Sequence, residues 1–181
     1  YDANNINPLY GFFVARAGLG ASESMRSKLA EYNDPRLSRA FITKQGTSGK
    51  EQAPGTADNA VYAPNGTPEQ GTSKYGTSLF MYSISAPTLL LSYHELKFLE
   101  AEALCRLERD AKSALKDAVV AGLLNAENSF TISRKELGKT LINAASSITE
   151  AEAESYFDNT IEAKYTAEPL KTTMTQKYFA L

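Results

Sequence analysis

The sequence predicts a mainly α-helical protein that carries a long irregular loop and little or no sheet. Residues 88–181 contain repeated helix-start signals followed by apolar residues at helical spacing. Residues 46–87 contain instead repeated glycine, proline, threonine and serine, which provide turn chemistry without a helical or strand period. We therefore expect a single segment of 181 residues, with a short helix and extended pieces over 1–45, the loop over 46–87 and a helical region over 88–181.

The part of the chain before the loop is expected to hold a single short helix. Residues 22–32 read as a helix, and Asn33-Asp34-Pro35 should end it because proline disfavours helical geometry in the residue before it. Two short apolar runs, 12–15 and 79–82, are interpreted as strands or extended segments.

The helical region is predicted to open with an antiparallel helix pair. Ser92 and Glu95 form a capping box that starts a helix over about 92–107. A second helix should follow Asp110 as its cap. The expected core face of the first helix is Leu96, Leu99, Ala103 and Leu107. The second carries a small-residue face that permits close approach, formed by Ala111, Ala114, Leu115, Ala118, Val119 and Gly122.

Three further helices are expected to complete the chain. Two more capping boxes begin at Ser133 and Thr149, and Pro169 suits the first turn of a last helix. Their candidate core residues are Leu137, Leu141 and Ile142, then Ala153, Tyr156, Phe157 and Ile161, then Leu170, Met174, Phe179 and Leu181.

Composition excludes several classes of function. The 19 basic and 21 acidic residues nearly balance, and no basic run exceeds a pair, so nucleic acid is not an expected partner. The single cysteine, Cys105, excludes an internal disulfide framework and a multi-cysteine zinc site. No apolar stretch approaches the roughly 18 residues of a membrane span. Because the chain starts at Tyr1 and stops within a helical pattern, we expect a fragment truncated at both ends.

Catalytic and metal-binding patterns are weak, so we predict no enzyme, no cofactor and no metal. The only imidazole is His94, read as a partly exposed histidine at a helix start; a hydrolase would have to use it with a nearby Ser or Glu. Glu95 and Glu102 share a helix face at about 10 Å, too far apart for a retaining glycosidase, and are read as a solvated face.

The loop offers a better case for ligand binding. Flat aromatic rings stack on sugar rings, while amides hydrogen-bond to ring hydroxyls, so this composition suits a carbohydrate or another neutral polar ligand. Tyrosines also favour protein interfaces, or could simply pin the loop onto the helices. The candidate ligand-binding residues are Tyr62, Tyr75, Tyr82, Asn59 and Asn65.

Three blocks of sequence together form a pattern that is typical of one protein family. The first runs from Ser22 and Met25 through Leu29 to Asn33-Asp-Pro-Arg-Leu37. The most specific is Ala86-Pro-Thr-Leu-Leu-Leu-Ser-Tyr-His-Glu-Leu-Lys-Phe-Leu-Glu-Ala-Glu-Ala103, and the last is Thr175-Gln-Lys-Tyr178. With these blocks the sequence resembles the SusD/RagB-like outer-membrane lipoproteins of gut and oral Bacteroidetes, and the resemblance covers roughly 22–42 and 79–181 in the family's order.

This resemblance implies a scaffold of tetratricopeptide-like helix pairs and a location outside the outer membrane. Family members bind a polysaccharide, oligosaccharide or sometimes a peptide, do no chemistry, and sit on a TonB-dependent, SusC-like transporter. Their lipid anchor is attached to an N-terminal cysteine that this chain does not contain, since Cys105 lies mid-helix. An alternative is a structural scaffold that caps the transporter without binding a ligand.

Overall fold

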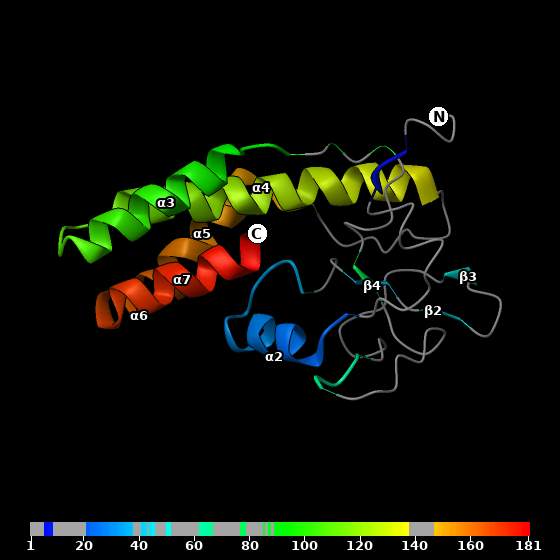
Figure 1. Cartoon of the computed structure of the whole chain (residues 1–181), viewed down its shortest axis with the longest axis horizontal. Helices are drawn as coiled ribbons and strands as arrows, with labels where there is room; N and C mark the ends of the chain where they lie inside the picture. Colours follow the sequence, from blue (N-terminus) through cyan, green and yellow to red (C-terminus); the bar gives the residue numbers. More distant parts are fainter. Residues whose placement is uncertain are drawn as a thin grey trace. The chain divides into compact units, whose positions relative to one another are not determined.

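Helices dominate the part of the chain that the computed structural model describes (Figure 1), which confirms the predicted fold class. That part consists of residues 6–8, 21–37, 41–42, 44–45, 50–51, 62–66, 77–78, 85, 87, 89–137 and 147–181. The chain divides into two units, which we describe separately. Unit 1 is residues 1–31, 36–88 and 128–146, and unit 2 is residues 32–35, 89–127 and 147–181.

Unit 1 contains helix α2 and two small strand pairs. Helix α2 spans Glu23–Glu31, inside the predicted 22–32, and the Ser22 hydroxyl accepts a hydrogen bond from the Met25 amide at 3.4 Å. The strands are two residues long, and both pairs are antiparallel: β1 (Phe41–Ile42) with β4 (Thr77–Ser78), and β2 (Lys44–Gln45) with β3 (Lys50–Glu51). The predicted extended runs at 12–15 and 79–82 lie outside the described residues.

Unit 2 begins with the predicted antiparallel helix pair. Helix α3 spans Tyr93–Arg106, and its N-cap Ser92 accepts a hydrogen bond from the Glu95 amide at 3.2 Å. Helix α4 spans Lys112–Leu137, of which residues 112–127 belong to unit 2 and residues 128–137 to unit 1. Asp110 accepts from the amide of Lys112 at 3.0 Å. A Cβ added at Gly122 of α4 would lie 3.9 Å from His94 Cβ near the start of α3, as an antiparallel arrangement requires. The same Cβ would lie 3.3 Å from Ala180, so this glycine permits a close three-helix contact.

The helix start predicted at Ser133 is wrong. Helix α4 continues without a break through Ser133 to Leu137. A capping box stabilises a helix start only where the preceding residues leave the helix, and here the preceding residues continue it. The predicted core residues Leu141 and Ile142 lie outside the described part of the chain.

The predicted core face of α3 is also wrong. Its buried residues are His94, Phe98 and Ala101, whereas the four predicted core residues are exposed; Leu96, for example, is 51% exposed. Both sides of α3 carry apolar residues, and in unit 2 the side with Phe98 packs inward. Spacing alone cannot decide between two apolar sides of one helix.

The remaining helices of unit 2 follow from local signals. Helix α5 (Glu150–Tyr156) starts with the complete capping box of Thr149 and Glu152, as predicted. It continues into the π-helical segment η3 (Phe157–Ile161) and helix α6 (Glu162–Ala167). Glu168 then leaves helical geometry before a proline, and Pro169 starts helix α7 (Pro169–Ala180).

The core of unit 2 gathers side chains from all these helices. Its largest fully buried apolar side chains are Phe98, Phe157, Leu115, Leu123 and Ile161. The predicted small-residue face of α4 is buried, and so are the predicted core residues of α5 and η3. On α7 only Phe179 is buried as predicted; Leu170, Met174 and Leu181 are exposed, and the buried positions are filled instead by Thr172, Thr173 and Gln176.

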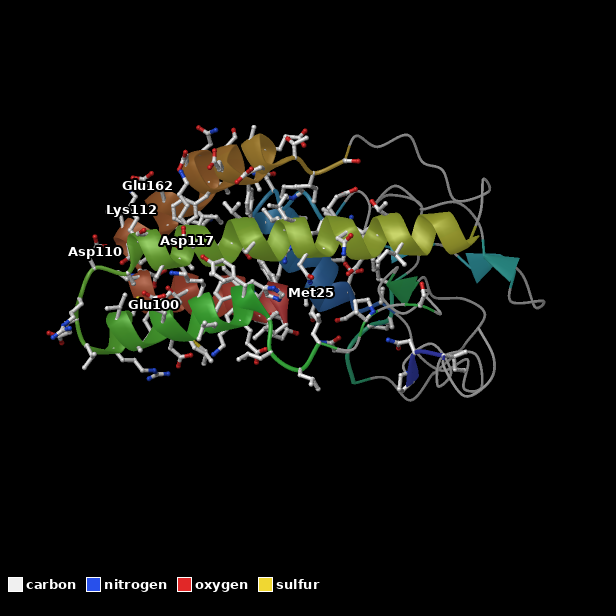
Figure 2. The ribbon with its side chains drawn as sticks, turned by 90° about the horizontal axis from the view of Figure 1, so that it is seen from above. Met25, Glu100, Asp110, Lys112, Asp117 and Glu162 are labelled. Atoms are coloured by element: carbon white, nitrogen blue, oxygen red, sulfur yellow. The ribbon has the colours of Figure 1, made fainter. Side chains whose placement is uncertain are left out.

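Polar contacts tie α4 to the helices beside it. Lys112 of α4 contacts Glu162 (Figure 2). Lys116, one turn further along α4, contacts Asp158 at 2.7 Å. The Tyr165 hydroxyl accepts a hydrogen bond from the buried amide of Ala111 at 2.8 Å. Burial raises the pKa of this phenol, which keeps it neutral and able to hold the start of α4.

A carboxylate between α3 and α7 predicts a pH dependence of stability. Lys177 and Arg106 donate to Glu102 at 2.8 and 2.9 Å, and these bonds hold the Glu102 pKa below its usual value of 4.5. A carboxyl group whose pKa is lower in the folded state adds stability at pH values above its unfolded-state pKa. This stability is lost as the pH falls through the folded-state pKa. Between pH 7 and pH 3 the free energy of unfolding, measured with urea, should therefore fall less for Glu102→Gln than for wild type. The control is Glu108→Gln, at an exposed carboxylate after α3, which should lose as much stability as wild type does. An equal loss in Glu102→Gln and wild type would contradict this role of Glu102.

Candidate functional site

The described part of the predicted binding loop is a short segment beside the start of α2. Residues 62–66 pair with the chain at Ser22 through a parallel bridge at Ala63. The Ala63 amide donates to the carbonyl of Ala21 at 2.8 Å, and its carbonyl accepts from the amide of Glu23 at 3.0 Å. Two of the five predicted ligand-binding residues, Tyr62 and Asn65, therefore lie in one anchored segment.

Tyr62 is buried in this segment and contacts Arg26. It is 8% exposed, and the guanidinium carbon of Arg26 lies 5.7 Å from its ring centroid. A cation over an aromatic face stabilises both groups. In unit 1 this contact occupies one ring face, and a sugar would need access to the other.

Asn65 is exposed and connects the segment to α2. Its side-chain oxygen accepts from the Ser22 hydroxyl at 3.0 Å, and its amide nitrogen donates to Ser24 at 2.7 Å. The next residue, Gly66, adopts a φ of +75°, which a side chain would oppose. Asn65 and Gly66 thus form a turn that is fixed against the first residues of the helix.

The other three predicted residues, Asn59, Tyr75 and Tyr82, lie outside the described part of the chain. Ligand binding by the five residues stays a prediction. For Tyr62 and Asn65 the structure adds contacts that position the base of the loop.

The alternative catalytic residues lie in the helices of unit 2. His94 is buried at 4% exposure, not partly exposed as expected, and its Nε2 lies 3.2 Å from the hydroxyl of Ser92. That hydroxyl also caps α3, so the pair has a clear role at the helix start. Glu102 is bound by Lys177 and Arg106, and its side chain is only 17% exposed, so it is less solvated than expected. Among the described residues, no three metal-ligating side chains gather at one place.

Unit 2 carries a run of exposed apolar side chains at and before α3, which we call the leucine face. Leu90 is 95% exposed, and Leu107 at the far end is 64% exposed. Large apolar patches on a protein surface usually mark contact sites. The leucine face comprises Leu89, Leu90, Leu91, Tyr93, Leu96, Leu99 and Leu107. Within the ranges that the structure describes, no helix combines the length and apolar character needed to cross a membrane.

These features define a mainly helical protein whose candidate site is a polar, aromatic loop. The chain belongs to the SusD-like family described as "Starch-binding associating with outer membrane", which it matches over residues 2–181. This family membership confirms the resemblance found in the sequence.

Two solved structures are similar to the chain. One is a SusD/RagB family protein from Bacteroides thetaiotaomicron, with 59% sequence identity and a TM-score of 0.91 over 99% of this chain. The other is a SusD homolog from Bacteroides fragilis with 19% identity and a TM-score of 0.69 over 99% of this chain, which supports the fold alone. The chain spans 38% and 40% of their respective lengths. A comparison with curated proteins found no match.

Proposed function

We propose that this chain belongs to a cell-surface protein that captures a glycan for import by a TonB-dependent, SusC-like outer-membrane transporter. The observation that carries the proposal is the match to a family described as starch-binding over residues 2–181. The protein acts by binding and leaves its ligand chemically unchanged. Its ligand is a polysaccharide or oligosaccharide, with a peptide as the less favoured class.

The composition of the loop supports a carbohydrate ligand. Tyr75 and Tyr82 supply aromatic rings, Tyr62 is a buried ring beside Arg26 at the base of the loop, and Asn59 and Asn65 supply amide groups. Aromatic stacking adds only about 1 kcal/mol per ring beyond the burial of area, so several rings are needed for useful affinity. Modest affinity also suits an import protein, which has to release its ligand to the transporter.

The proposed location is the outer face of the outer membrane, and the family description, "Starch-binding associating with outer membrane", supports an association with that membrane. We propose that contact with the membrane is through a lipid anchor, as in the lipoproteins that the sequence resembles. The transporter is the protein partner, and nucleic acid is not one.

Retention in polysaccharide gels tests this proposal. The purified protein should migrate more slowly in native gels that contain starch than in gels without polysaccharide. Parallel gels with dextran and xylan would report the preference among glycans. Normal migration in every gel by a folded protein would contradict glycan capture.

A second candidate function is a scaffold that holds the transporter without binding a ligand. The leucine face is the observation that favours it, because exposed leucines on α3 and in the residues that flank it suit a protein contact better than a sugar contact. Co-purification with a large β-barrel protein distinguishes the two functions. If the barrel is retained by wild type and the protein binds no glycan, the scaffold function replaces the first proposal.

A further inference from the structure

Unit 2 contains a pocket lined in part by amide and hydroxyl side chains, and none of its lining residues is among those predicted for the loop site. Its volume is about 440 Å³, and it is an open hollow of the surface and not an enclosed cavity. We call it the η3 pocket, because it opens where α5 continues into η3. The residues that matter for its chemistry are Asn33, Pro35, Ser155, Tyr156, Asn159 and Thr160.

The base of the η3 pocket is fixed by a buried hydrogen bond. The Tyr156 hydroxyl donates to Asp34 at 3.2 Å, and these residues are only 6% and 3% exposed. Asn33, beside them, has a φ of 49°, a left-handed conformation that asparagine tolerates better than most residues. The turn at 33–35 is therefore held against α5.

The π-helical geometry of η3 brings the polar residues together. Phe157 and Ile161 of this segment are fully buried, whereas Asn159 is exposed. The wider turn places Ser155, Asn159 and Thr160 along one pocket. Such π-helical turns are often found at functional sites.

The lining favours a neutral ligand that is rich in hydroxyl groups. It contains side-chain amides and hydroxyls, no lysine or arginine, and one carboxylate, Glu152, which accepts the Thr149 amide at 2.9 Å in the capping box. Asn159 donates to the Ser155 hydroxyl at 2.9 Å. In that bond the side-chain oxygen of Asn159 remains an acceptor and the hydroxyl hydrogen of Ser155 remains a donor. A sugar hydroxyl can bond to both.

We propose that the η3 pocket is a second glycan subsite that binds a sugar residue of an oligosaccharide. The inference rests on the proposed function, and it adds a binding region outside the loop.

The test is a titration with maltoheptaose, followed by backbone amide NMR shifts and by calorimetry. In wild type, amides of residues 155–160 should shift on addition of the sugar, and they should still shift in Tyr75→Ala/Tyr82→Ala. The double variant Ser155→Ala/Asn159→Ala should weaken maltoheptaose binding about 3- to 30-fold, because it removes two hydrogen-bonding side chains. The matched control, Ser113→Ala/Asn128→Ala, makes the same changes at exposed positions of α4 outside the η3 pocket and should bind as wild type does.

The outcomes separate this inference from the proposed function. If wild type binds maltoheptaose but residues 155–160 do not shift and the double variant binds equally well, the η3 subsite is overturned and glycan capture stands. If wild type binds neither maltoheptaose nor the polysaccharides of the gel assay, both proposals fail. A circular dichroism melt of each variant checks that the helices remain folded.

Discussion

Replacing Phe98 with alanine is expected to lower the free energy of unfolding by about 3–5 kcal/mol. Phe98 is fully buried in the core of unit 2, and its removal leaves a cavity that the packed helices fill only in part. Because small domains have a total stability of about 5–15 kcal/mol, this variant should be close to unfolding at room temperature. Urea denaturation followed by circular dichroism measures the change.

The matched control on the same helix is Leu96→Ala. Leu96 is 51% exposed and on the leucine face, so its truncation should change the stability by less than about 1 kcal/mol. Equal losses in the two variants would mean that both sides of α3 are packed in solution. A larger loss for Leu96→Ala would reverse the assignment of the buried side.

Replacing Tyr62, Tyr75 and Tyr82 together with alanine is expected to abolish retention in starch gels. Each stacked ring contributes about 1 kcal/mol beyond area burial, and the loss of Tyr62 also removes the buried ring that packs against Arg26, so the triple change brings a modest affinity below the detectable range. Because Tyr62 is buried beside Arg26, the pair Tyr75→Ala/Tyr82→Ala is measured as well, and it should weaken retention while leaving that contact intact.

The control for the tyrosine variants is Tyr178→Ala, at a tyrosine of α7 that is 62% exposed. It removes an exposed ring of the same kind outside the loop and should leave retention unchanged. If the triple variant folds and is retained as wild type is, the loop does not bind the glycan. The η3 pocket would then be the remaining candidate on this chain.

Helix starts were predictable because their signals are local. Ser92, Thr149 and Pro169 each act through the backbone of the next few residues, so the sequence around them is sufficient. The prediction of a helix start at Ser133 was wrong because the same local pattern also fits inside a longer helix. No local signal marks the π-helical segment η3, which follows α5 without a break.

Side-chain environments were less predictable because they depend on distant partners. Leu96 and Phe98 are both apolar residues of α3, and only the packing of unit 2 shows which one is buried. The base of the η3 pocket joins Asp34 to Tyr156, 122 residues apart in the sequence. Asn65 likewise meets Ser22 across 43 residues, so its contact with α2 was not visible in the loop composition.

The measurement that tests the central claim most directly is calorimetric titration of the purified protein with maltoheptaose. Glycan capture predicts saturable binding with a dissociation constant of about 0.01–1 mM, as expected for a few stacked rings and hydrogen bonds. The absence of binding heat at millimolar sugar, in a sample that circular dichroism shows to be helical, would contradict capture of a starch-type glycan.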